Sequence, residues 1–90
     1  MLRRYQLNEF YMKKVSIYTT PTCGYCKMTK EFFGANNIAF EEYDVAADEQ
    51  KRAEMIEKSG QMGVPVIFVD DEMTIGFDKQ RLSELLGISE

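Results

Sequence analysis

The sequence has no histidine and no tryptophan, and it has only two cysteines among its 90 residues. A tetrahedral zinc site of cysteine and histidine takes four ligands. This chain cannot complete such a site alone, because a metal would need a second subunit or thiols from outside. We therefore expect no metal site within the chain.

The sequence also lacks any run close to the ~20 apolar residues of a membrane span. Its basic start at 1–11 is not followed by the continuous apolar stretch of a signal peptide. We therefore expect a cytoplasmic protein that does not associate with membranes. Thiols stay reduced in the cytosol, so a cysteine pair there is more often catalytic or metal-binding than structural.

Positive charge is scarce, with 11 Lys and Arg against 15 Asp and Glu and a formal net charge of −4. Because phosphate binding needs clustered Lys and Arg, nucleic acid is not an expected partner. Acidic residues gather in the middle of the chain, at Glu41, Glu42, Asp44, Asp48, Glu49, Glu54 and Glu57. We interpret them as a solvated face, with docking of a basic partner as the alternative.

Ninety residues fit one domain with a modest core. Met12-Lys13-Lys14, immediately before the first expected strand, looks like a natural start. We therefore divide the chain into an N-terminal extension of uncertain origin at 1–11 and a single domain at 12–90. No function is assigned to the extension.

Hydrophobic patterning and turn residues predict four strands and three helices in the order βαβαββα. The expected strands are 15–19, 38–45, 66–69 and 73–75, and the expected helices are 24–35, 49–59 and 79–86. Asp48 and Asp78 are the expected N-caps of the last two helices, which Gly60 and Gly87 end. A right-handed crossover makes the first two strands parallel, and the turn at 70–71 makes the last two antiparallel.

Two helix faces follow from the same patterning. The first helix is expected to bury an apolar stripe of Tyr25, Met28, Phe32 and Phe33. The second helix is expected to present Ala53 and Ile56 to the core.

Both cysteines lie in T-T-P-T-C-G-Y-C-K, residues 19–27, where the first strand gives way to the first helix. Cys23 is expected at the helix N-terminus, where unpaired N–H groups and the helix dipole stabilise a thiolate over a thiol. Cys26 lies one turn further, where it can hydrogen-bond that thiolate and later close a disulfide. The spacing predicts a nucleophile, Cys23, and a resolving thiol, Cys26.

Other interpretations of this segment stay open. The cysteines can be half of a metal site, an inert buried pair or a structural disulfide. Lys27 lies four residues after Cys23 and can stabilise its thiolate. A lysine so early in a helix opposes the dipole, however, so the alternative is a side chain that points to solvent.

The order strand, T-x-C-x-x-C-K, helix and then G-V-P-V-I-F-V resembles the glutaredoxins of the thioredoxin superfamily from Val15 onward. The segments S-G-Q-M-G-V-P-V-I at 59–67 and I-G-F-D-K at 75–79 are most similar to small glutaredoxin-like proteins of the NrdH-redoxin and YruB type. The resemblance implies an α/β thioredoxin fold, with a four-stranded mixed sheet in order 2-1-3-4 and helices on both faces.

The resemblance also implies a substrate-binding set. Pro65 is expected to be cis, although sequence physics alone favours trans. The turn then brings the Val64 backbone beside the nucleophile, where it can pair with an extended substrate. Gly76 and Phe77 are expected to bind substrate as well. Tyr25 is expected to pack on a bound peptide or tripeptide, or else to cover the exposed end of the core.

The resemblance leaves two reductants. Glutaredoxins that use glutathione usually have Pro-Tyr between the cysteines, a lysine shortly before them, and Gly-Gly followed by an acid late in the chain. Here the residues between the cysteines are Gly24-Tyr25, the lysine is replaced by Thr20, and the Gly-Gly is replaced by Gly76-Phe77. Asp78 does not align cleanly with the acid. Gly-Phe is the NrdH-redoxin pattern, which implies reduction by a flavin-dependent thioredoxin reductase. Glutathione is the alternative.

We therefore expect a monomeric dithiol–disulfide oxidoreductase, without a tightly bound cofactor, that reduces disulfides in proteins or small molecules. The first alternative is an iron–sulfur cluster held by two chains and two outside thiols. The second is a redox-switched module that binds a partner without turnover.

Overall fold

The computed structural model describes residues 13–88, so the extension expected at 1–11 lies outside the described residues. The elements are β1 (Val15–Thr19), α2 (Gly24–Ala35), β2 (Glu41–Asp44), α3 (Glu49–Ser59), β3 (Val66–Val69), β4 (Glu72–Ile75) and α4 (Lys79–Leu86). Their order is the predicted βαβαββα.

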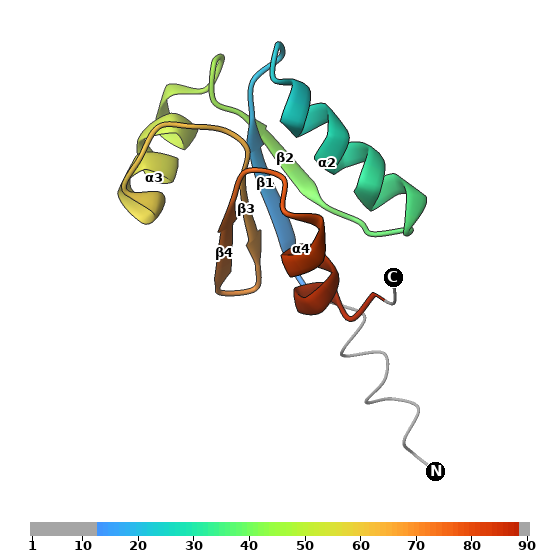
Figure 1. Ribbon diagram of the computed structural model, residues 1–90. Helices are drawn as coiled ribbons and strands as arrows, with labels where there is room; N and C mark the ends of the chain where they lie inside the picture. The colour runs from blue at the N-terminus through green and yellow to red at the C-terminus, as the bar shows by residue number, and fades with distance from the viewer. Residues whose placement is uncertain (1–12, 89–90) are drawn as a thin grey trace.

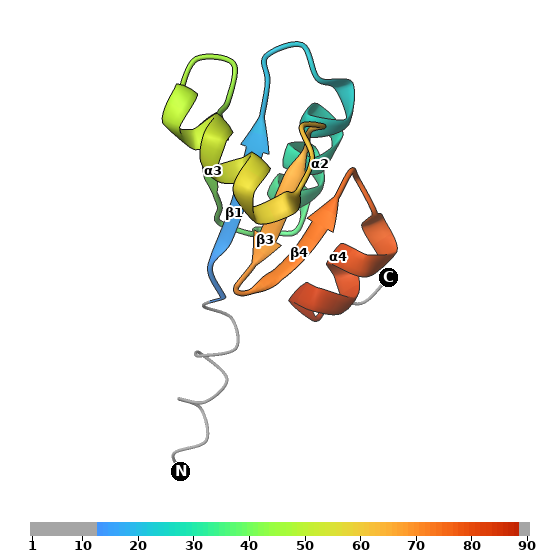
Figure 2. The ribbon, with the colours of Figure 1, turned by 90° about the vertical axis from the view of Figure 1, so that its left-hand side faces the viewer.

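The four strands form one mixed sheet in the order β2-β1-β3-β4. β1 pairs in parallel with β2 and antiparallel with β3, and β3 pairs antiparallel with β4. Helix α3 covers one face of the sheet, while α2 and α4 cover the other (Figures 1 and 2). The predicted thioredoxin fold is confirmed.

Two apolar clusters hold the helices to the sheet, because successive side chains of a strand point to opposite faces. The cluster under α2 and α4 contains Val15, Ile17, Phe33, Ile67, Val69 and Leu82. The cluster under α3 contains Tyr18, Val45, Met55 and Val66. All five residues of β1 are buried, as expected for a central strand with a helix layer on each side.

The helix ends confirm the predicted caps. The Asp48 side chain accepts from the backbone N–H of Lys51, and the Asp78 side chain accepts from that of Arg81. Helices α3 and α4 end at glycines in the left-handed conformation, Gly60 and Gly87.

The predicted buried stripe of α2 is wrong in its first turns. Tyr25 and Met28 are exposed, and the buried residues are Cys26, Thr29 and Phe33. These three lie at i, i+3 and i+7, so they share the face that meets the sheet. Thr29 is tolerated there because its hydroxyl donates to the Tyr25 carbonyl at 2.8 Å.

Two smaller predictions also need correction. In α3 the buried residue is Met55, and Ala53 is exposed, because the helix presents the face of Met55 and the partly buried Ile56 to the sheet. β2 begins at Glu41 rather than at Ile38. Ile38 and Phe40 lie before the strand and pack against the cluster under α2 and α4, so their apolar character reflects burial without strand pairing.

Candidate active site at the start of helix α2

Cys23 is the N-cap residue of α2, as predicted. Its backbone is extended, with φ −85° and ψ 111°, and its Sγ accepts a hydrogen bond from the Cys26 backbone N–H at 3.0 Å. The sulfur therefore takes the place that a serine or aspartate oxygen has in other helix caps. Cys23 and Cys26 form a disulfide, with their Cα atoms 5.2 Å apart.

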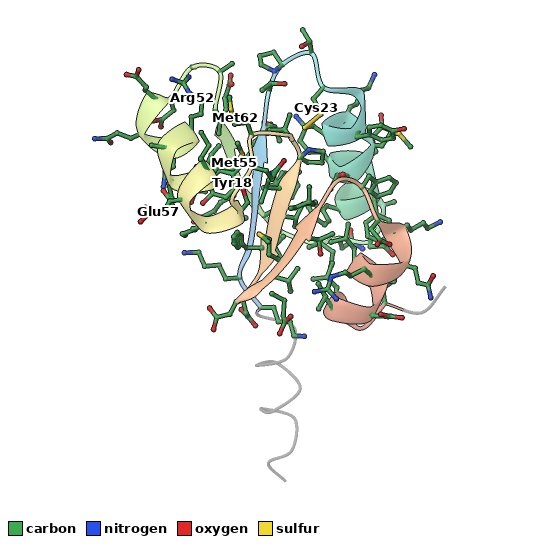
Figure 3. All side chains as sticks on the ribbon, turned by 60° about the vertical axis from the view of Figure 1, so that its left-hand side comes forward. Tyr18, Cys23, Arg52, Met55, Glu57 and Met62 are labelled. Atoms are coloured by element: carbon green, nitrogen blue, oxygen red, sulfur yellow. A yellow bond between two sulfur atoms is a disulfide. The ribbon has the colours of Figure 1, made fainter. Side chains whose placement is uncertain are left out.

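The two sulfurs differ in access. Cys23 is partly exposed, whereas Cys26 is buried, with 1% of its surface accessible. Cys23 lies at the end of the molecule where α2 begins (Figure 3). An incoming disulfide can therefore approach Cys23, while Cys26 can be reached only from within the protein.

The loop before β3 comes close to the disulfide. The Val64–Pro65 peptide bond is cis, as the resemblance implied. The Val64 carbonyl oxygen lies 3.8 Å from Cys23 Sγ. At the other side of this loop, the Gly76 N–H donates to the Pro65 carbonyl at 2.8 Å, which places Gly76 next to the residue that follows Val64.

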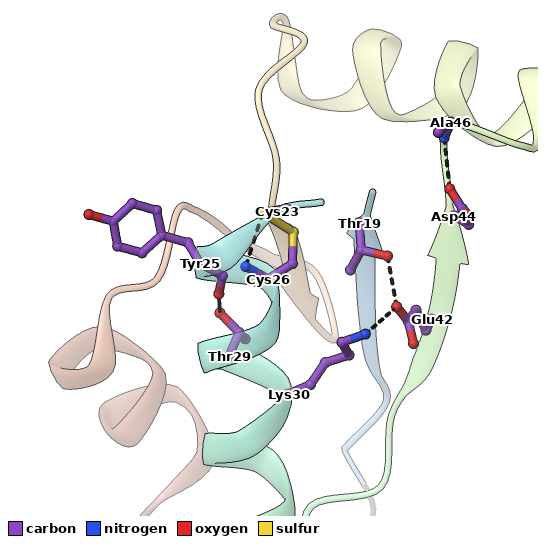
Figure 4. Close-up of polar contacts among 9 residues, drawn as sticks. All are labelled: Thr19, Cys23, Tyr25, Cys26, Thr29, Lys30, Glu42, Asp44 and Ala46. Atoms are coloured by element: carbon purple, nitrogen blue, oxygen red, sulfur yellow. Dashed lines mark hydrogen bonds and ion pairs between the residues drawn. A yellow bond between two sulfur atoms is a disulfide. The ribbon is translucent and has the colours of Figure 1, made fainter. Parts of the chain in front are cut away.

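The other predicted site residues are Phe77, Tyr25 and Lys27. The Phe77 ring is partly buried and packs edge-on against Phe32, with the ring centroids 5.9 Å apart. Tyr25 is 63% exposed and projects away from the cysteine pair (Figure 4), so it does not cover the core. Lys27 is exposed on α2. Substrate contacts of Phe77 and Tyr25, and an effect of Lys27 on the thiolate, stay predictions.

A polar cluster that the sequence did not indicate lies between the sheet and α2. Glu42 Oε2 accepts from the Thr19 hydroxyl and from Lys30 Nζ, each at 2.8 Å (Figure 4). The hydrogen bonds from Lys30 and then from Thr19 lower the pKa of Glu42. Parallel pairing of β1 with β2 brings these residues together, and that pairing is a long-range feature that no local pattern in the sequence marks.

A second cluster lies under α3 and changes the interpretation of the acidic region. Glu54 accepts from the Tyr18 hydroxyl at 2.9 Å and from Lys51 and Lys58 at 3.0 Å each. Hydrogen bonds from Lys58, Lys51 and Tyr18, in that order, lower the pKa of Glu54 to about 2. Burial and the neighbouring carboxylate raise the pKa of Tyr18 to about 12. Glu54 is thus a partly buried structural residue, whereas most of its acidic neighbours are solvated as predicted.

Within residues 13–88, no three His, Cys, Asp or Glu side chains gather in a way that would hold a metal ion. Over the same range, no helix has the length and apolar character needed to cross a membrane.

A mixed sheet in order 2-1-3-4, a Cys-x-x-Cys disulfide at the start of the first helix after β1 and a cis-proline beside it define a thioredoxin-fold redox protein. The family model described as glutaredoxin matches residues 15–74. The chain belongs to the glutaredoxin family. This membership and the cysteine pair support thiol–disulfide oxidoreductase activity.

Individual relatives agree with this placement. A glutaredoxin-like 8.6 kDa protein of the rubredoxin operon of Clostridium pasteurianum is 44% identical over 72 residues, which cover 80% of this chain and 96% of that protein. The thioredoxin-like protein BC3987, solved as a mutant, superposes with a TM-score of 0.81 at 36% identity, covering 87% of this chain and all of the other. NrdH-redoxin from Escherichia coli superposes with a TM-score of 0.71 at 26% identity, covering 80% and 93% of the two chains.

Proposed function

We propose that this chain is a dithiol electron carrier that reduces disulfides in proteins or small molecules. Cys23 is the nucleophile and Cys26 is the resolving thiol. The observation that carries the proposal is the Cys23–Cys26 disulfide across the first turn of α2, in which only Cys23 is open to an incoming molecule.

The cycle transfers two electrons. In the reduced protein, the Cys23 thiolate attacks one sulfur of a substrate disulfide, forms a mixed disulfide and expels the other sulfur as a thiolate, which takes up a proton. Cys26 then loses its proton and attacks the Cys23 sulfur, which releases the second substrate thiol and closes the Cys23–Cys26 disulfide. The substrate gains two electrons and two protons, and the protein dithiol is oxidised.

The helix start favours this chemistry. The Cys26 N–H that reaches Cys23 Sγ at 3.0 Å can donate to a thiolate, and a hydrogen bond to an ionised acceptor is stronger than one to a neutral group. The N-terminal end of the helix dipole contributes about 0.3–2 kcal/mol in the same direction. Beside the sulfur, the Val64 backbone is placed to pair with an extended substrate segment.

The oxidised protein must be reduced again, and we propose thioredoxin reductase as the electron source, with glutathione as the alternative. Gly76-Phe77 stands where glutathione-using relatives usually carry Gly-Gly. NrdH-redoxin from Escherichia coli, a structural neighbour, is a glutaredoxin-like protein with a thioredoxin-like activity profile. We further propose that the chain works as a monomer in the cytoplasm, where reducing systems keep such a dithiol in use.

NADPH consumption tests the proposal. The oxidised protein is offered NADPH with thioredoxin reductase, or with glutathione and glutathione reductase, and insulin or a small disulfide as the final acceptor. We expect turnover that is greater with thioredoxin reductase and is abolished in Cys23→Ser. Wild-type rates in both Cys23→Ser and Cys26→Ser would overturn the proposal. State-dependent capture of a partner without NADPH consumption would indicate a redox-switched binding module instead.

A further inference from the structure

The loop that carries Val64 and Pro65 is closed by one side chain. Gln61 Oε1 accepts from the Gly63 N–H at 2.7 Å, and Gln61 Nε2 donates to the Gly63 carbonyl at 3.1 Å. A single amide group therefore occupies both backbone polar groups of Gly63. We call this pair of hydrogen bonds the Gln61 latch.

The latch is anchored on helix α3. The hydroxyl of Ser59, the last residue of that helix, accepts from the Gln61 backbone N–H at 3.4 Å and from Gln61 Nε2 at 3.3 Å. The same oxygen lies 2.6 Å from the carbonyl of Met55, whose side chain is buried in the cluster under α3. The loop is thus tied to the core at its first residues.

Gly63 and Gln61 constrain each other. A Cβ added at Gly63 would lie 2.8 Å from Gln61 Oε1, too close for any real contact. Unlike Gly60 and Gly76, Gly63 does not have a positive φ, so its backbone conformation is open to alanine. The obstacle to a side chain at this position is therefore the Gln61 latch.

We infer that Gln61 is a positioning residue for disulfide reduction, an inference that rests on the proposed function. The latch holds the loop so that the Val64 carbonyl stays 3.8 Å from Cys23 Sγ. Because Gln61 already occupies the N–H and C=O of Gly63, an extended substrate pairs with the backbone at Val64 and not one residue earlier. The same turn leaves Met62 70% exposed at the end of the molecule where Cys23 lies (Figure 3).

Gln61→Ala tests the inference by comparing the kinetics with a protein disulfide and with a small disulfide. We expect KM for a protein disulfide to rise roughly tenfold, because the freed loop must be ordered again when the substrate binds, at about the backbone entropy of one residue. The rate with a small disulfide, which makes no extended pairing, stays within about twofold of wild type. Gln50→Ala, at an exposed position of α3, is the matched control and leaves both substrates unchanged. An equal loss with both substrates, or no loss with either, would overturn the inference.

Gly63→Ala gives a second, independent test. In the wild-type background we expect it to resemble Gln61→Ala, because the new Cβ expels Gln61 Oε1. In the Gln61→Ala background the same change should add less than about twofold, since the clashing atom is gone. Equal penalties for Gly63→Ala in the two backgrounds would contradict the latch.

Gln61→Glu supplies a conservative variant with a pH signature. The carboxylate introduced by this change can accept from the Gly63 N–H when it is ionised but cannot donate to the Gly63 carbonyl, whereas the protonated acid can do both. The activity of this variant relative to wild type should therefore rise as the pH falls through the usual glutamate pKa range, between about 6 and 4. A flat ratio over this range would contradict the inference.

Amide hydrogen exchange separates failure of the latch from failure of the proposed function, because it needs no turnover. We expect the Gly63 N–H to exchange at least tenfold faster in Gln61→Ala than in wild type, with the amides of β1 unchanged. If the exchange rate at Gly63 does not change, the latch inference is wrong whatever the activity. If it changes while Cys23→Ser retains full activity, the proposed function is wrong and the latch is a structural feature of the loop.

Discussion

We expect the hydrogen bond between Tyr18 and Glu54 to contribute measurably to the free energy of unfolding. Tyr18 is 2% exposed, and its hydroxyl donates to Glu54 Oε2 at 2.9 Å. Tyr18→Phe keeps the buried ring and removes this bond. A hydrogen bond to a charged group is worth about 1.5–3 kcal/mol. The Glu54 side chain is 31% exposed and keeps Lys51 and Lys58, so water can replace part of the loss. We expect Tyr18→Phe to lower the free energy of unfolding by about 1–2 kcal/mol at pH 7.

The pH dependence sharpens this prediction. The pKa of Glu54 is about 2 in the folded protein against an ordinary value of 4.5, so its contribution is complete above pH 4.5 and is lost as the pH falls toward 2. Tyr18→Phe removes one of the three hydrogen bonds that lower this pKa, so the stability gap between wild type and the variant should narrow as the pH falls toward 2. At the alkaline end, the pKa of Tyr18 rises from 10 to about 12 on folding. The stabilisation from the Tyr18 hydroxyl is complete below pH 10 and is lost as the pH rises through 12. Tyr18→Phe has no hydroxyl to ionise, so its stability should not fall for this reason over that range.

Urea unfolding followed by circular dichroism, on oxidised protein at pH 7 and pH 2, measures the deficit and its acid dependence. Tyr43→Phe is the matched control, because its hydroxyl reaches the exposed Glu41 at 2.6 Å. We expect that variant to lose less than about 0.5 kcal/mol. The reasoning fails if Tyr18→Phe matches wild type within error at pH 7, or if its deficit is the same at both pH values.

Three further changes probe other parts of the molecule. Phe33→Ala removes a fully buried ring from the cluster under α2 and α4, and should lower the free energy of unfolding by about 3–5 kcal/mol in thermal or urea denaturation. A decrease of less than about 1 kcal/mol would contradict the packing. Asp48→Ala removes the side chain that accepts from the Lys51 N–H and should lower the free energy of unfolding by about 1 kcal/mol. Asp48→Asn keeps an acceptor and should leave stability nearly unchanged, so equal losses in the two variants would refute the capping role. Lys30→Met should raise the pKa of Glu42 in an NMR titration, because Lys30 is the larger cause of its lowering; an unchanged titration would refute the ion pair.

Local sequence signals were sufficient to predict the order of helices and strands and the place of the cysteines, whereas the sheet order came from the family resemblance. Asp48 and Asp78 are cap residues, Gly60 and Gly87 end helices, and the run at 66–69 has the composition of a central strand. The cysteine spacing placed one sulfur at the start of a helix and the other one turn later. Each of these features depends on residues that are neighbours in the sequence, so local patterns carry them.

The sequence was a poorer guide wherever the answer depends on packing between distant segments. Tyr25 and Met28 are apolar at helical spacing, yet the helix is turned so that Cys26 and Thr29 meet the sheet. Glu54 lay in a region predicted to be solvated, and only the position of α3 over Tyr18 brings it into a partly buried network. The Gln61 latch depends on the path of a loop, for which the sequence offers no periodic signal.

The central claim is that the exposed sulfur attacks and the buried sulfur resolves. Reduced Cys26→Ser protein, mixed with a disulfide substrate and analysed by intact-mass and peptide mass spectrometry, tests it directly. We predict a mixed disulfide at Cys23 that persists until another thiol is added, while wild type releases the substrate and closes Cys23–Cys26. Absence of that adduct, together with an equal or faster reaction at Cys26 in the Cys23→Ser variant, would contradict the account.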